Sequence, residues 1–157
     1  MNLRDQVRHA IEQGQSGQFK AMEKLVAEEP RAVRHLLGMT YHPDSDKRNV
    51  ASRGLALASR HHPKLVQEVV RRLIWAMNDE SGTNALTAPE VIQAIAEEQP
   101  QLLVPLVPDL TRLAGDPGLQ NGLATALKIV SQRCPGKVGE SLGKSLRKRF
   151  RDGRRVR

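Results

Sequence analysis

Four prolines recur along the chain at a nearly constant interval. Pro30, Pro63, Pro100 and Pro135 are separated by 33, 37 and 35 residues. The positions eight and five residues before each proline, and three residues after it, are apolar in all four copies. These twelve residues are Met22, Leu55, Ile92 and Leu127; Leu25, Ala58, Ile95 and Val130; and Val33, Val66, Leu103 and Val138. A period of this size indicates a stacked repeat, in which each unit buries its apolar face only against its neighbours.

Each period has the length and the apolar spacing of two helices joined by a turn. Proline is favourable in the first turn of a helix, because the N–H that it lacks has no partner there, so each proline is predicted to open a second helix. The sequence predicts an N-terminal helix over 3–13 and four hairpins, 18–28 with a helix from Pro30, 46–60 with 63–77, 87–98 with 100–114, and 119–132 with 137–150. Pro105 and Pro108 predict a late start or a bend in the third hairpin. Asp46 is predicted to cap the helix over 46–60. Thr87 and Glu90 have the spacing of a capping box.

The composition favours close-packed helices in one domain. Hydrophobic residues make up 39% of the 157 residues but aromatic residues only 3%, which does not suit a β-sandwich. Cys134 has no cysteine to pair with, and no segment has the apolar character of a signal peptide or a membrane span. We therefore expect a soluble cytoplasmic protein without a membrane partner, with one domain over 1–150 and a basic tail over 151–157.

Positive charge is concentrated at the end of the chain. The net charge is +8, of which residues 144–157 carry +7 and residues 1–143 only +1. The basic residues of this segment are candidate phosphate contacts for RNA or DNA, non-specific and salt-dependent because no base-reading motif accompanies them. The alternative is a solvated chain end. The eight residues are Lys144, Arg147, Lys148, Arg149, Arg151, Arg154, Arg155 and Arg157.

Three segments resemble HEAT-like repeats. Residues 46–58 and 88–95 resemble the first helix of such a repeat, and residues 105–113 resemble the second. The resemblance covers roughly 18–150 and implies an all-α, right-handed α-α superhelix of about four HEAT-like hairpins plus an N-terminal helix. In the last helix Lys137, Ser141 and Ser145 occupy slots that are apolar in earlier units, which is typical of a capping helix.

A narrower similarity covers Trp75-Ala-Met-Asn-Asp-Glu-Ser-Gly82 and Ala88-Pro-Glu90. It resembles a signature of small bacterial and archaeal HEAT-repeat proteins, in which a Gly-rich stretch with a Trp follows the Ser-Gly. This chain has Thr83-Asn-Ala-Leu86 at that place. HEAT-like repeats also occur in phycobilin lyases and alkylpurine DNA glycosylases, so the resemblance alone does not assign a function.

The loop after the second hairpin holds the densest polar cluster. Its carboxylates could bind a cation, a basic peptide or a metal through oxygen ligands. Turn and capping chemistry explains most of the same residues, and we favour that interpretation. The cluster consists of Asn78, Asp79, Glu80 and Ser81, with Glu90 from the following helix.

Trp75 is the only tryptophan of the chain. It follows Leu73 and Ile74 in an apolar stretch, so we expect it to pack between adjacent repeats; the alternative is an exposed anchor at a binding face. Trp75 and Asp79 lie one helical turn apart, an aromatic-carboxylate pair similar to that of the HEAT-like DNA glycosylases.

No catalytic motif stands out, the five histidines lack metal-ligand spacing, and nothing indicates a cofactor or a metal. The sequence therefore predicts a non-catalytic binding or scaffold protein whose partner is another protein. Nucleic-acid binding, or DNA repair of the alkylpurine glycosylase kind, is the alternative. The candidate contact residues are polar and face outward on the second helices: Arg31, Arg34, Lys64, Gln67, Arg71 and Gln101.

Overall fold

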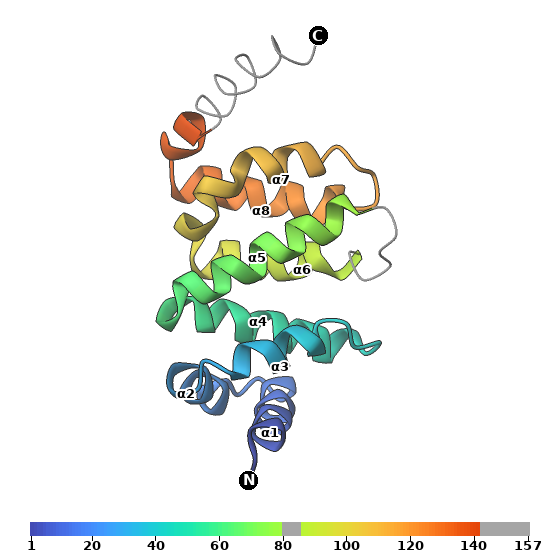
Figure 1. The fold of residues 1–157 in the computed structure, drawn as a ribbon, viewed down its shortest axis with the longest axis vertical. Coiled ribbons are helices and arrows are strands. Elements are labelled where there is room, and N and C mark those ends of the chain that lie inside the picture. The colour runs from blue at the N-terminus through green and yellow to red at the C-terminus, as the bar shows by residue number, and fades with distance from the viewer. Residues whose placement is uncertain (80–85, 142–157) are drawn as a thin grey trace.

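The computed structural model describes residues 1–79 and 86–141, and these residues form helices and no strands (Figure 1). The all-α prediction is confirmed. The helices are α1 (Leu3–Gln15), α2 (Lys20–Glu28), α3 (Ala32–Met39), α4 (Ser45–His61), α5 (Pro63–Asn78), α6 (Ala88–Glu98), the 3₁₀ helix η2 (Pro100–Leu106), α7 (Val107–Leu113) and α8 (Gln120–Arg133). Residues 137–141, the last described, are also helical.

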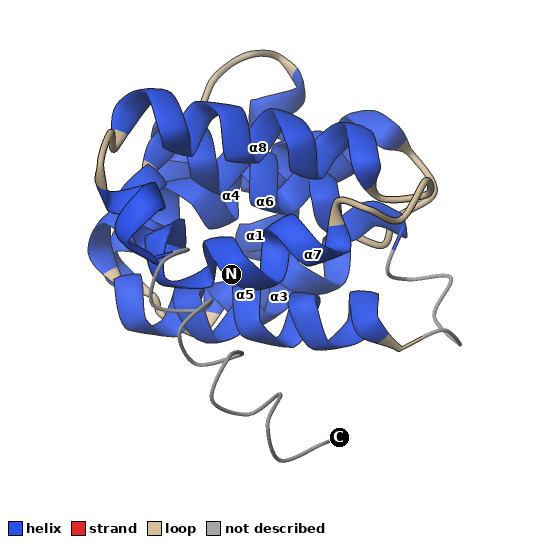
Figure 2. Ribbon diagram, turned by 90° about the horizontal axis from the view of Figure 1, so that it is seen from above, coloured by secondary structure: helices blue, strands red, loops and turns tan. Residues whose placement is uncertain are grey.

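The helices stack in pairs along the long axis of the molecule (Figure 1). Among the first helices of the pairs, α4 packs between α2 and α6, and α6 packs against α8. The second helices α3, α5 and α7 lie together on the other side (Figure 2). The N-terminal helix α1 packs against α2, α3 and α4.

The turn between the two helices of a pair is built the same way four times. The residues before the prolines, Glu29, His62, Gln99 and Cys134, have φ between −124° and −139° and ψ between 59° and 92°. Each donates its N–H to the carbonyl four residues earlier, at 2.7–2.8 Å. Proline disfavours the α-helical conformation in the residue before it, and at these four positions the first helix ends there and the chain reverses.

The repeating apolar positions form the interior. Ten of the twelve side chains are buried. The other two, Leu127 and Val138, belong to the last unit and are partly buried against the core. They have no further unit to cover them in the described chain, as expected at the end of a stack.

Side chains also join one unit to the next across one period of the sequence. The Nε2 of His62 lies 2.8 Å from the carbonyl oxygen of Val26. The amide of Gln67 donates to the carbonyl of Leu102 at 3.1 Å. In the last pair the guanidinium of Arg133 donates to the carbonyl of Glu97. Each of these carbonyls lies near the end of a helix or in η2, where backbone acceptors lack some intrahelical partners.

The structure corrects several local predictions. The cap of α4 is Asp44, whose side chain accepts from the N–H of Asp46 at 2.9 Å; Asp46 is not the cap. The capping box at Thr87 is wrong, since the Thr87 side chain makes no capping hydrogen bond to α6 and Glu90 pairs with Arg48. Of the late start or bend expected from Pro105 and Pro108, the structure shows the late start, because α7 begins only at Val107, after the 3₁₀ helix η2. The part of the predicted last helix beyond residue 141 lies outside the described residues.

Candidate binding surface

The outward side of α3 and α5, here called the second-helix face, gathers exposed cationic and aromatic side chains. Helical periodicity places Lys64, Arg71 and Trp75 along one stripe of α5. All three are exposed, as are Arg31, the N-cap of α3, and Arg34 on α3. Four of the six residues predicted as contacts therefore lie on this face.

A groove runs between α3 and α5 and has a volume of about 630 Å³. Its apolar lining includes Leu65, which is 39% exposed although it is a large aliphatic side chain. Arg31, Arg34 and Arg72 line the same groove, against one acid, Glu68. The remaining described residues around it are Leu3, Pro30, Val33, His35, Leu37 and Val69.

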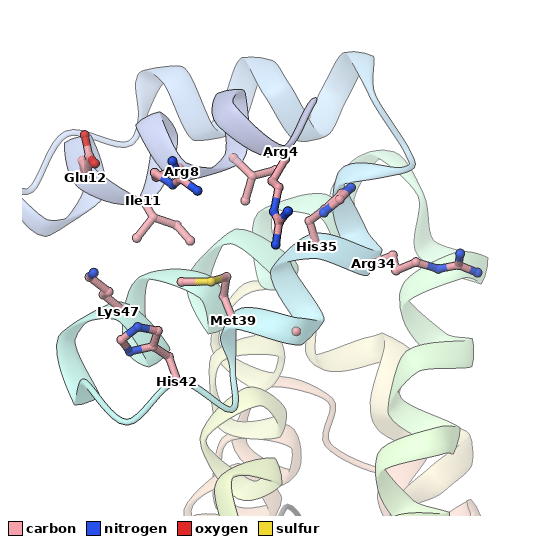
Figure 3. Close-up of a pocket in the computed structure, with 11 residues that line it drawn as sticks. Arg4, Arg8, Ile11, Glu12, Arg34, His35, Met39, His42 and Lys47 are labelled. Carbon is pink, nitrogen blue, oxygen red and sulfur yellow. The ribbon is translucent and has the colours of Figure 1, made fainter. Parts of the chain in front are cut away.

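A second depression of about 510 Å³, here called the α1/α3 hollow, lies on the other side of α3. Figure 3 shows Ile11 of α1 and Met39 of α3 facing each other across its middle. Arg4 and His35 approach each other at one end, and His42 and Lys47 lie together at the other. The full lining consists of Arg4, Val7, Arg8, Ile11, Glu12, Arg34, His35, Gly38, Met39, His42 and Lys47. Arg34 and His35 line both depressions, so α3 divides one cationic surface into two.

The cations of this surface are mostly not neutralised. Within the described chain Arg4, Arg34, Lys47, Arg71 and Arg72 make neither an ion pair nor a hydrogen bond. Two other arginines of the surface do form ion pairs, Arg8 with Asp5 at 3.8 Å and Arg31 with Glu29 at 3.7 Å, but exposed pairs of this kind are weak.

The net charge of +1 over residues 1–143 hides an uneven distribution of charge between the two ends of the stack. Residues 1–79 contain thirteen Lys and Arg against nine Asp and Glu, whereas residues 86–141 contain four against six. The cationic units therefore lie at the N-terminal end of the stack.

Trp75 does not pack between repeats, and that prediction is wrong. The residue is 71% exposed. Leu73, Ile74 and Met77 take the buried side of α5, and this orientation leaves position 75 pointing away from the core. The apolar stretch around it belongs to an amphipathic helix, which sequence proximity to Leu73 and Ile74 did not reveal.

The other predicted contact residues are engaged within the molecule. Gln67 is half-buried, and its amide donates to Leu102 of η2. Gln101 is exposed and its amide contacts the side-chain oxygen of Gln99. Both therefore form polar links around η2 in this structure.

The predicted polar cluster divides between turn and inter-unit roles. The Asn78 amide donates to the carbonyl of Ile74 at 3.1 Å, and the backbone of Asp79 caps α5. Glu90 binds Arg48 at 3.3 Å, so it joins α6 to α4. Glu80 and Ser81 lie outside the described residues.

The Arg48 guanidinium also donates to the carbonyls of His42 and Pro43, at 3.0 and 3.1 Å. It thereby fixes the loop before α4 as well as the α4–α6 contact. Among residues 1–79 and 86–141, no three His, Cys, Asp or Glu side chains come together as a metal site would require. The eight basic residues of 144–157 lie outside the described chain.

Sequence reasoning missed Arg4, Arg8, Met39, Lys47 and the Leu65–Arg72 part of the groove. A weak signal was present, since Arg4 and Arg8 lie one helical turn apart on α1. Their convergence with α3 depends on how α1 packs against the first pair, which no local pattern encodes.

No protein-family model, curated protein or solved structure matches the chain. In the described part of the chain, no helix is both long enough and apolar enough to cross a bilayer.

Proposed function

We propose that the protein is a non-catalytic binding protein, a right-handed superhelix of HEAT-like pairs that binds another protein through its second-helix face. The observation that carries the proposal is the exposed Trp75 on α5, the helix that also lines a cationic groove with apolar side chains. Tryptophan and arginine are the residues that most often dominate binding energy at protein interfaces.

The chemistry of the groove favours a polypeptide that carries both acidic and apolar side chains. Leu65, Leu37 and Val69 provide apolar contact, which a bare phosphate backbone would not use. Arg34 and Arg72 have no carboxylate partner in the described chain, so a partner's carboxylates would not have to displace an existing ion pair. Electrostatic attraction of this kind raises the association rate and decreases with salt.

The test is retention of proteins from a nuclease-treated lysate on the immobilised chain, followed by measurement with the purified candidate partner. Trp75→Ala and Leu65→Asp should each abolish most of the binding, since both lie on the second-helix face. Lys128→Ala, at an exposed position of α8, is the control and should bind as the wild type does. A partner whose affinity is equal for all four proteins would refute the assignment of this face.

The basic composition of residues 144–157 supports a second candidate function, the binding of RNA or DNA. It is tested by fluorescence anisotropy with labelled single-stranded RNA and duplex DNA. Binding that is lost on removal of 144–157 but unchanged in Trp75→Ala would support it. Absence of binding by the full chain at low salt would exclude it.

A further inference from the structure

The α1/α3 hollow has the build of a small-molecule site, and it adjoins the proposed protein interface at Arg34 and His35. Its volume of about 510 Å³ lies within the range of ligand pockets in proteins. Buried Val7 and Ile11 from α1 and half-buried Met39 from α3 supply its apolar wall. Methionine is unbranched and flexible, and it adapts its shape to apolar ligands.

The charges around this wall are unevenly placed. Figure 3 shows Arg4 and His35 toward one end of the hollow and Arg8 beside Ile11 near its middle, whereas Glu12 lies toward the other end with Lys47. Glu12 is the one acidic residue among the described lining residues. An opposite charge at the far end offsets Lys47, so the Arg4 end is the more positive of the two.

Arg4 also has no acid that neutralises it in the described chain. Its guanidinium is a planar donor that matches a carboxylate or phosphate in a bidentate arrangement. Arg8, whose ion pair with Asp5 is long at 3.8 Å, is available to the same anion.

We infer that the α1/α3 hollow binds a small amphiphilic organic anion that is not part of a protein partner. Its carboxylate lies at the Arg4 end and its apolar chain lies along Ile11 and Met39. The two sites share Arg34 and His35, but the inference does not depend on the proposed protein interface, because Met39 lines only the hollow and Leu65 lines only the groove.

The test uses the full-length ¹⁵N-labelled protein, titrated with decanoate, with decanol and with inorganic phosphate, all below the concentration at which decanoate aggregates. Decanoate should shift the amide resonances of Ile11, Gly38 and Met39. Decanol, which has the same chain without the charge, should bind roughly fivefold more weakly. Inorganic phosphate, which lacks the chain, should bind at least about tenfold more weakly.

Paired variants separate this site from general charge and from the neighbouring groove. Arg4→Gln with Arg8→Gln should weaken decanoate binding about fivefold. Lys64→Gln with Arg71→Gln makes the same change in charge on the exposed stripe of α5 and should change decanoate binding less than about twofold. Met39→Asp should abolish binding and Leu65→Asp should leave it intact. The dispersion of the ¹⁵N spectrum shows whether each variant is folded.

Three results would overturn the inference: no shift with decanoate, equal affinity for decanoate and decanol, or shifts that centre on Leu65 and Arg72. The protein interface is judged independently, by partner binding in Trp75→Ala and Leu65→Asp. Either proposal can therefore fail while the other stands.

Discussion

Leu55 and Leu127 hold the same position of the repeat, eight residues before a proline, but differ in burial. Leu55 is 0% exposed within α4, which is covered by neighbours on both sides. Leu127 is only partly buried, at the last described pair. Replacement by alanine removes the same three carbon atoms from each, so the comparison isolates the effect of stacking.

The loss of stability at Leu55 follows from two contributions. Three buried carbon groups at about 0.8 kcal/mol each give roughly 2.4 kcal/mol of lost transfer free energy. The cavity that remains raises the total for Leu55→Ala to about 3–4 kcal/mol, within the range of fully buried leucines. Leu127→Ala leaves a site open to solvent on one side, so we expect about 1 kcal/mol.

The assay is urea unfolding followed by far-UV circular dichroism, with the free energy of unfolding extrapolated to water. Native spectra that match the wild type show that both variants retain their helices. Equal losses at the two positions would refute the reasoning, because a stack requires its inner unit to depend more on its neighbours than its last unit does. A change in the slope of the unfolding free energy against urea concentration would show that the units no longer unfold together.

Other substitutions have matched controls within the chain. The buried Ser52 hydroxyl has no hydrogen-bond partner in the described structure. Ser52→Ala should therefore raise the free energy of unfolding by about 1 kcal/mol. Ser59→Ala, which loses a hydrogen bond to the Ala56 carbonyl, should not raise it. A Cβ added to Gly122 would lie 2.5 Å from the Cβ of Pro89, so Gly122→Ala should cost about 1–2 kcal/mol in the same urea assay despite the better helix propensity of alanine. Gly38 of α3 has open space around it, and Gly38→Ala should instead stabilise by about 0.5–1 kcal/mol; a shared sign for the two glycine variants would contradict the helix contacts described.

Much of the fold is predictable because its determinants are local. The proline biases the residue before it toward an extended conformation, and the apolar positions at fixed offsets from it define the buried sides of both helices. The cap of α4 was misplaced by two residues because Asp44 and Asp46 both have the chemistry of a cap. Only the backbone conformation of Asp44, extended at ψ 117°, decides between them.

The candidate site was less predictable because it is assembled between units. Helical spacing alone was enough to predict that Arg31 and Arg34 face outward, since a second helix of a pair has one outward side. The hollow beside them requires α1 to turn its Arg4 and Ile11 toward α3, and this depends on packing around Gly14, where an added Cβ would lie 2.5 Å from Val50. Trp75 was misassigned because its apolar neighbours in sequence point in a different direction.

Quenching of the fluorescence of Trp75, the only tryptophan, tests the central claim of an exposed aromatic in a cationic surface. Arg71 and Arg72 lie one helical turn before it, and both are exposed. Each ion is compared with its own quenching of N-acetyltryptophanamide, because iodide quenches free indole more efficiently than caesium. At low salt the ratio of iodide to caesium quenching should be higher for Trp75 than for this compound, and the excess should disappear in high salt or in Arg71→Gln with Arg72→Gln. Weak quenching by both ions would contradict the exposure of Trp75, and a ratio equal to that of the free compound at low salt would contradict the positive charge of the second-helix face.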